Sequence, residues 1–80
     1  MIVSEIEKSQ TGCIRVSLEQ FKGHRFIDCR IFWKDGSGEW RPSKKGISLN
    51  DETVKKVITA LSKADQELEK QASKQYAKGL

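Results

Sequence analysis

The chain has 80 residues and a net charge of +4. This length allows one domain, over residues 1–80, and a single core of this size rarely supplies more than about 3–5 kcal/mol, so small folds rely on disulfides, metals or a second subunit. No run of about 20 apolar residues could cross a membrane, and two cysteines with one histidine are too few for a structural zinc site. We therefore expect no metal, no cofactor and no membrane contact, with a second subunit as the source of added burial.

The positive charge is concentrated in the middle of the chain. Residues 21–46 hold seven basic and three acidic side chains, whereas residues 1–20 hold two basic and three acidic ones, and residues 47–80 hold six lysines and five acids. A local excess of this kind attracts polyanions such as nucleic acids. A solvated, lysine-rich surface explains the same pattern equally well, so charge alone leaves both interpretations open.

Two strands are expected in the first part of the chain. Ile2, Val3 and Ile6 indicate a short strand that ends at the turn-prone segment 9–12. Residues 13–19 alternate between apolar and polar side chains, which is the period of a half-buried strand. This alternation directs Ile14, Val16 and Leu18 toward a core, and Arg15, Ser17, Glu19 and Phe21 toward the other face.

Residues 24–34 carry the strongest strand signal, because they are rich in β-branched and aromatic side chains. A tight turn at residues 22–23 precedes them, and a hairpin loop over residues 35–38 follows. Both faces carry large side chains, so we expect a central strand with Ile27, Cys29, Ile31 and Trp33 on one face and Phe26, Asp28, Arg30 and Phe32 on the other. Residues 40–49 form the fourth strand. Pro42 cannot donate to a ladder, so this strand is expected at an edge, or bent there.

The second half of the chain is predicted to be one helix. Asn50 can cap it, and two acids in the first turn suit the helix dipole. An apolar stripe follows at three- and four-residue spacing, made of Val54, Val57, Ile58, Leu61, Ala64 and Leu68. Only Ala72 and Tyr76 continue it. The expected domain core therefore covers about residues 2–68, with 69–80 as a helix extension or a frayed tail.

These elements predict an α+β fold, in which a four-stranded, curved antiparallel sheet is followed by one long helix that covers one of its faces. One helix is too small to cover all the apolar surface, so part of the stripe or the sheet edge would stay exposed in a monomer. We therefore predict a homodimer. The expected interface residues are Val54, Val57, Ile58, Leu61 and Leu68.

No catalytic constellation is found in the sequence. His24, the one histidine, sits at a predicted turn, and no nucleophile is placed beside it. Cys29 lies mid-strand on the apolar face, where a thiol behaves as a small hydrophobe. Cys13 falls on the neighbouring strand, so a disulfide between the two stays open, although reduced thiols suit the cytoplasmic location expected of a chain without a signal-like start. We predict that the chain is not an enzyme.

Cationic and aromatic side chains are interleaved in the middle of the chain. They occur as Phe21 with Lys22, as Arg30, Trp33 and Lys34, and as Trp40 with Arg41. Proteins that bind single strands combine cations that follow the phosphates with aromatic rings that stack on bases. The alternative is that Trp33 and Trp40 are core residues with lysines at the sheet margin. As a set, the pattern favours nucleic acid.

Five sequence blocks occur in order over the same region. They are Phe-Lys-Gly at 21–23, Ile-Asp-Cys-Arg at 27–30, Trp33, Gly-Glu-Trp-Arg-Pro at 38–42 and Lys-Lys-Gly-Ile-Ser-Leu-Asn at 44–50. Together they resemble the transcriptional coactivator family called positive cofactor four, from about Arg15 to about Leu68. The serine- and acid-rich regulatory arm of animal members is absent, which indicates a prokaryotic or phage member.

The resemblance implies a dimer of curved sheets, with helices at the dimer interface and grooves that hold single-stranded DNA with little sequence preference. Family positions that contact DNA fall on Phe21, Lys22, His24, Arg30, Trp33, Lys44 and Lys45, with Arg25, Trp40 and Arg41 as additions. Because His24 is largely neutral at pH 7 where the family often has lysine, Arg25 is expected to supply that charge. Arg30 and Trp33 can serve one groove only if the strand twists or bulges between them.

The sequence therefore predicts a binder of single-stranded DNA that acts in transcription, replication or repair, with transcription or replication proteins as further partners. Two alternatives stay open. One is a protein-interaction module that works through the long helix. The other is a binder of duplex DNA or of RNA that uses the basic sheet.

Overall fold

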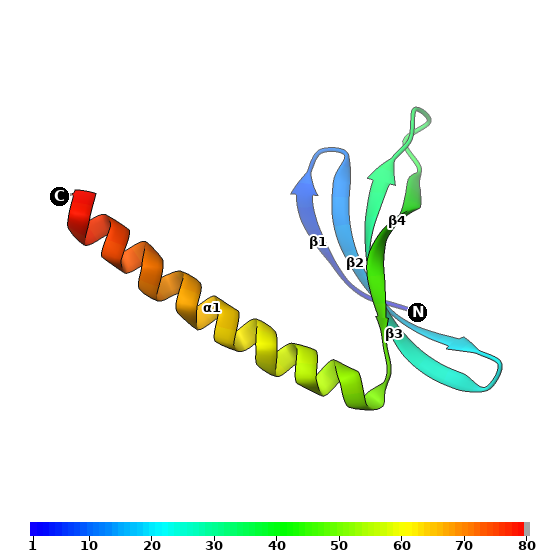
Figure 1. The fold of residues 1–80 in the computed structure, drawn as a ribbon. Coiled ribbons are helices and arrows are strands. Elements are labelled where there is room, and N and C mark those ends of the chain that lie inside the picture. Colours follow the sequence, from blue (N-terminus) through cyan, green and yellow to red (C-terminus); the bar gives the residue numbers. More distant parts are fainter. Residues whose placement is uncertain (80) are drawn as a thin grey trace.

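The computed structural model describes the backbone of residues 1–79 and the side chains of residues 1–72. Its elements are the strands β1 (Ile2–Ser9), β2 (Gly12–Phe21), β3 (His24–Lys34) and β4 (Trp40–Leu49) and the helix α1 (Asp51–Gly79). The strands form one open, curved sheet in the order β1-β2-β3-β4, and each pairs antiparallel with the next (Figure 1). The predicted α+β architecture is confirmed.

Tight connections join the last three strands. Lys22 and Gly23 link β2 to β3 with φ of 52° and 80°, the left-handed conformation that a two-residue hairpin of this kind needs at both positions. In the loop between β3 and β4, the Asp35 N–H donates to the Glu39 carbonyl at 2.9 Å, and the Gly38 N–H donates to the Asp35 carbonyl at 3.0 Å. Both expected turns are confirmed.

The central strand β3 is paired differently on its two sides. Along β2 the pairing is continuous. Along β4 it is irregular, because Gly46 stands opposite Arg30 whereas the next pair joins Pro42 to Phe32. Residues 43–45 of β4 therefore stand opposite a single residue of β3. The fourth strand is an edge strand with an irregularity next to its proline, as predicted.

The most buried side chains of the sheet lie on the face opposite to the one that the sequence predicted. Among the described side chains only Cys13 and Ser17 are buried, at 4% and 7% exposure. They point away from the face of Ile14, Val16 and Leu18, the three residues predicted to face a core. Those three are half-buried or exposed, with Leu18 at 37%. The prediction was wrong because no second layer covers their face within one protomer.

The cross-strand pairs define two faces of the sheet. The polar face carries Cys13, Arg15, Ser17, Asp28, Arg30 and Phe32. The apolar face carries Ile14, Val16, Leu18, Ile27, Cys29, Ile31 and Ile47. Cys13 and Cys29 therefore point to opposite faces, and both are free thiols, so the disulfide that the sequence left open does not form.

Asn50 is the only residue between β4 and α1, and it caps the helix. Its Oδ1 accepts hydrogen bonds from the N–H groups of Glu52 at 3.0 Å and Thr53 at 2.8 Å, which satisfies two of the free donors in the first turn. The predicted cap is confirmed.

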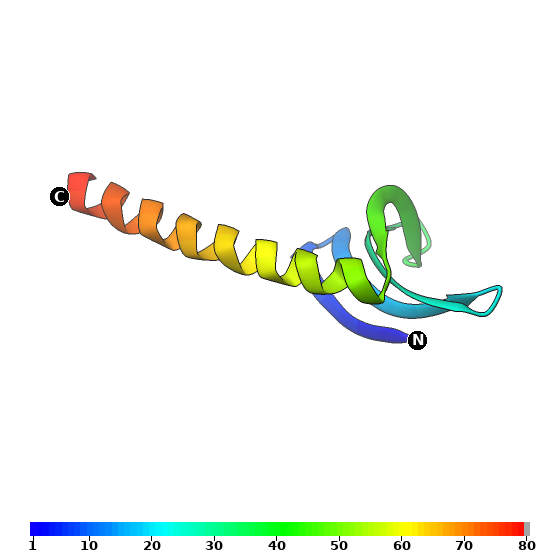
Figure 2. The same ribbon diagram turned by 60° about the horizontal axis from the view of Figure 1, so that its bottom comes forward.

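The helix leads away from the sheet and does not cover it (Figures 1 and 2). Val54 and Val57 are half-buried near the start of the helix, whereas Ile58, Leu61 and Leu68 are 58%, 63% and 66% exposed. The predicted packing of the helix on one sheet face is therefore wrong for the protomer. Tyr76 lies outside the described side chains. No helix within residues 1–79 has the length and apolar character needed to span a membrane.

Candidate nucleic-acid interface

The ten side chains predicted to contact nucleic acid lie in three places. Phe21, Lys22, His24 and Arg25 surround the β2–β3 turn; Arg30, Lys44 and Lys45 lie in the middle of β3 and β4; and Trp33, Trp40 and Arg41 lie at the β3–β4 hairpin. Eight of them are exposed, and Arg30 and Trp40 are half-buried. The interface is therefore spread along the sheet, with the turn at one end and the hairpin at the other.

Phe21 and Lys22 place an aromatic ring and a cation side by side at the turn. Phe21 is 66% exposed, as predicted, and Lys22 Nζ lies 5.4 Å from the centre of its ring. Phe21 pairs with His24 across the hairpin, so its ring projects on the side of the polar face. A ring this exposed can stack on a base while the neighbouring ammonium group meets a phosphate.

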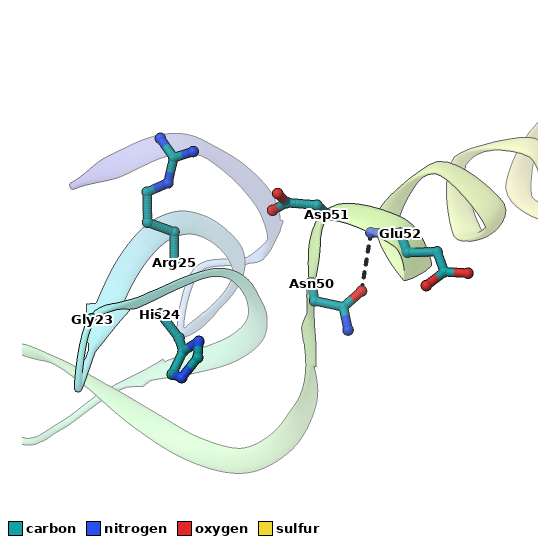
Figure 3. A pocket seen from close by; sticks show the side chains of 6 residues that line it. All are labelled: Gly23, His24, Arg25, Asn50, Asp51 and Glu52. Atoms are coloured by element: carbon teal, nitrogen blue, oxygen red, sulfur yellow. Dashed lines mark hydrogen bonds between the residues drawn. The ribbon is translucent and has the colours of Figure 1, made fainter.

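A hollow of about 430 Å³ lies next to the same turn (Figure 3). It is lined by Gly23, His24 and Arg25 from the turn and by Asn50, Asp51 and Glu52 from the start of α1. His24 and Arg25 extend to opposite sides of the ribbon, as neighbours in a strand do. Arg25 therefore lies on the other side of the strand from His24, and the two carboxylates of the helix start make this hollow unsuitable for a phosphate.

Arg30 is anchored within the sheet. Its Nε and Nη2 donate to the two carboxylate oxygens of Asp28, both at 3.0 Å, and its Nη1 donates to the carbonyl oxygen of Ser43 at 3.0 Å. The hydrogen bond to Asp28 raises the pKa of Arg30 above its ordinary value, against the effect of desolvation. Arg30 therefore joins β3 to β4, and only its remaining N–H groups are available to a ligand.

The irregular segment of β4 presents two lysines, Lys44 and Lys45, from a fixed backbone. Ser43 Oγ donates to the carbonyl of Ile31 at 2.7 Å and accepts from the N–H of Lys45 at 3.1 Å. Within the part of the chain whose side chains are described, neither lysine forms an ion pair. Two exposed cations that form no ion pair among the described side chains can each contact a phosphate.

The β3–β4 hairpin carries one aromatic–cation pair on each face. Trp33, 47% exposed, stands opposite Arg41. Trp40 stands opposite Lys34, whose Nζ lies 5.4 Å from the centre of the indole ring. Arg41 is also bound to Asp35, because its Nε donates to Asp35 Oδ2 at 2.7 Å. Within the protomer Trp33 is exposed and Trp40 is half-buried, so neither is among the two buried residues of the described side chains.

The ten residues do not share one face. Because β3 is paired continuously with β2, Arg30 and Trp33 are three positions apart in a regular strand and point to opposite faces. The irregularity that could have brought them together lies in β4. Phe21 and Arg30 share the polar face, whereas Trp33 and Arg41 share the apolar face. One protomer therefore carries two aromatic sites on two faces.

Sequence reasoning missed several side-chain interactions that the sheet and its loop contain. Arg15 lies over the ring of Phe32 at 4.1 Å and its Nε is 3.2 Å from Glu5 Oε1. The sequence Asp-Gly-Ser-Gly did indicate that Asp35 closes the loop. An aspartate at the start of a turn accepts a hydrogen bond from the backbone N–H two residues later. No comparable signal marks Ser43, because the irregularity of β4 depends on the strand beside it.

The fold and the placement of these side chains define a class of protein, a four-stranded meander with a basic and aromatic surface, followed by a helix. The family model described as Transcriptional Coactivator p15 (PC4) matches residues 8–60, which is more than half of the chain. The chain belongs to this family. The family expected from the five sequence blocks is confirmed.

Three relatives place the chain within the family. A PC4 homolog from Burkholderia pseudomallei K96243 is 33% identical, with a TM-score of 0.79 over 84% of this chain and 90% of that one, which agrees with the expected prokaryotic or phage type. MoSub1 in complex with single-stranded DNA is 31% identical, with a TM-score of 0.57 over 84% and 77% of the two chains. The RNA polymerase II transcriptional coactivator SUB1 of Saccharomyces cerevisiae is 36% identical over 61 residues, or 75% of this chain. The chain spans 21% of the length of that relative.

Proposed function

We propose that this protein binds single-stranded DNA with little sequence preference and catalyses no reaction. The observation that carries the proposal is the pairing of exposed aromatic rings with cations at both ends of the sheet, Phe21 with Lys22 and Trp33 with Arg41. The complex of MoSub1 with single-stranded DNA, on a related fold, supports it. Stacking on an aromatic ring requires an unpaired base, which favours single strands over duplex.

The cations have different roles in this proposal. Lys22, Lys44 and Lys45 are exposed, and each can give its full charge to a phosphate. Arg30 already donates three hydrogen bonds within the sheet, so it contributes mainly by holding β3 against β4. None of these contacts reads a base edge or a 2′-hydroxyl, so RNA is expected to compete with DNA.

We also propose that the functional form is a homodimer. One protomer buries only two of its described side chains, while Ile47 on the apolar face is 51% exposed. A second copy would cover this face together with the helix stripe of Val54, Val57, Ile58, Leu61 and Leu68. Because Trp33 and Arg41 lie on the same apolar face, the dimer must leave the hairpin uncovered.

The proposed setting is the cytoplasm of a bacterium or of a phage-infected cell, in transcription, replication or repair. Transcription or replication proteins are the expected further partners. Residues 2–68 form the proposed domain core, with 69–80 as an extension. The exposed side chains of Ile58, Leu61 and Leu68 also fit a helix that binds another protein. If the unmodified protein formed a stable dimer but bound no DNA, that result would favour the second function.

The test is a titration of a labelled thymidine oligonucleotide at several salt concentrations, alongside a duplex and a uridine oligonucleotide of equal length. If about five phosphates are neutralised, log K should fall with log salt at a slope near −3 to −4, at roughly −0.7 per contact. Duplex should bind more weakly. A slope near zero, or tighter binding of duplex, would contradict the proposal.

Two double variants with the same change in net charge test which lysines contact the DNA. Reversal of Lys44 and Lys45 to glutamate should reduce the slope by roughly 1.4, because two contacts are lost. Reversal of Lys63 and Lys70, which are exposed on the helix, makes the same change in net charge and should leave the slope unchanged. Equal effects of the two double variants would show that net charge, and not the strand segment, determines affinity.

A further inference from the structure

The two carboxylate oxygens of Asp35 have separate partners. Oδ1 accepts hydrogen bonds from the Ser37 N–H at 2.9 Å, the Ser37 hydroxyl at 2.7 Å and the Glu39 N–H at 3.0 Å, which closes the β3–β4 loop. Oδ2 accepts from Arg41 Nε at 2.7 Å. These hydrogen bonds, led by that from Arg41, lower the pKa of Asp35 to about 2, so the carboxylate is charged at any working pH.

The contact with Asp35 fixes Arg41 by one edge of its guanidinium group. A guanidinium group has five N–H donors in a planar fork, and binding through Nε leaves the Nη groups, of which Nη2 also lies 3.5 Å from Glu39 Oε2, for a second acceptor. The Arg41 side chain is 54% exposed, whereas that of Asp35 is only 15% exposed. Arg41 also stands directly opposite Trp33 on the neighbouring strand, on the same face. The Nη edge of the guanidinium group, which only the highly exposed Glu39 approaches, is therefore presented on the same face as an exposed indole ring.

We propose that Asp35 is a positioning residue for DNA binding, which holds Arg41 beside Trp33 so that a phosphate meets a guanidinium group already in place. The inference rests on the proposed function of the chain. Its physical basis is preorganisation, because an arginine that is fixed before binding loses less side-chain freedom when the phosphate arrives. Asp35 itself does not touch the ligand.

Simple electrostatics predicts the opposite effect for this residue. Asp35 is an anion next to a binding cation, so its removal raises the net charge from +4 to +5 and should tighten the binding of a polyanion. Glu39 provides the comparison within the same loop. Its Oε2 lies 3.5 Å from Arg41 Nη2, it is 71% exposed, and it does not hydrogen-bond Nε. Glu39→Gln makes the same change in charge without releasing Nε.

The experiment compares Asp35→Asn and Glu39→Gln for binding of a thymidine oligonucleotide at low salt. An asparagine keeps an amide oxygen for the loop but loses the charge that holds Arg41. Asp35→Asn should therefore weaken binding about two- to tenfold despite the added charge, as expected for the loss of one immobilised side chain. Glu39→Gln should bind as tightly as the unmodified protein or more tightly. Tighter or unchanged binding by Asp35→Asn would overturn the inference.

Two further variants separate positioning from loop folding. Arg41→Lys keeps the charge and the loop hydrogen bonds of Asp35 but has no Nε fork, so it should weaken binding to a similar extent with a smaller fall in melting temperature than Asp35→Asn causes. This variant tests the inference even if Asp35→Asn does not fold. In an Arg41→Ala background, Asp35→Asn should cause no further loss. A further loss equal to that in the native background would assign the effect to the loop and overturn the inference.

The failure of the inference can be distinguished from the failure of the proposed function. If the unmodified protein does not bind the oligonucleotide, both are wrong. If the unmodified protein binds with the expected salt slope, but neither Asp35→Asn nor Arg41→Lys weakens binding, only the positioning role of Asp35 is wrong.

Discussion

Gly46 lies against the backbone of Arg30, its partner on the central strand. A Cβ atom at position 46 would stand 2.8 Å from Arg30 Cα and 2.7 Å from the carbonyl oxygen of Cys29. Both neighbours are backbone atoms in a paired strand, so neither can move aside cheaply. The glycine of the Lys-Lys-Gly-Ile-Ser-Leu block is therefore required by the close approach of β4 to β3 immediately after the irregular segment.

Gly46→Ala is expected to destabilise the protein by about 1–3 kcal/mol, as overpacking of a tight contact does. Thermal unfolding measures the effect. Gly36→Ala is the control, because a Cβ there meets nothing within 4 Å and Gly36 does not have a positive φ. Similar melting temperatures for the two variants would show that β4 can move away from β3 at little cost.

Phe21→Ala should weaken binding of single-stranded DNA without loss of stability. The ring is 66% exposed, so little burial is lost. Stacking on one base is worth about 1–3 kcal/mol, which corresponds to a loss of roughly five- to a hundredfold in affinity. Phe32→Ala should lower the melting temperature and leave the affinity of the folded protein unchanged, because that ring is half-buried beneath Arg15. A melting temperature that falls for Phe21→Ala with unchanged affinity would make Phe21 a structural residue.

Leu61→Asp should dissociate the proposed dimer. Leu61 is 63% exposed in the protomer, so the substitution has little effect on a free monomer, but it would place a charge in an apolar interface of the dimer. Sedimentation should report about twice the chain mass for the unmodified protein and a lower mass for the variant. Ser62→Asp, one position along the helix, should leave the mass unchanged. A monomer for the unmodified protein would rule out the dimer.

The contribution of Asp35 to stability should depend on pH. Its pKa is about 2 in the folded protein against an ordinary value of 3.8. A depressed pKa means that the stabilisation is fully present above the unfolded value and is lost as the pH falls through the folded value. The melting temperature of the native chain should therefore exceed that of Asp35→Asn at pH 5, and the difference should shrink toward pH 2. A difference that does not change with pH would contradict the assignment.

The bounds of the third and fourth strands could be predicted from the sequence. Residues 24–34 and 40–49 are strand over the whole of the expected ranges, because β-branched and aromatic runs end there at strong turn signals. The cap at Asn50 was equally visible, since a side-chain oxygen before an acidic first turn satisfies free N–H groups. These features are local, and a single chain determines them.

The features that could not be predicted depend on neighbouring strands or on a second molecule. Alternation shows that Ser17 and Val16 lie on different faces, but not which of the two faces is more buried in the protomer. The apolar stripe of α1 predicts a buried face, but not that the helix leads away from its own sheet. The internal partners of Arg30 and Arg41 depend on the register of β4 against β3. A basic residue in the sequence can therefore form hydrogen bonds within the sheet as readily as it can contact a ligand.

The backbone conformation of Lys22 lowers the stability of the β2–β3 hairpin at a position whose side chain is proposed to bind DNA. A left-handed backbone at φ 52° is unfavourable for a residue with a Cβ by roughly 1–2 kcal/mol, whereas asparagine adopts it more easily. Lys22→Asn should therefore raise the melting temperature and at the same time lower the affinity for single-stranded DNA. A lysine at this position therefore lowers the stability of the hairpin and at the same time places an ammonium group where the proposed contact with DNA requires it.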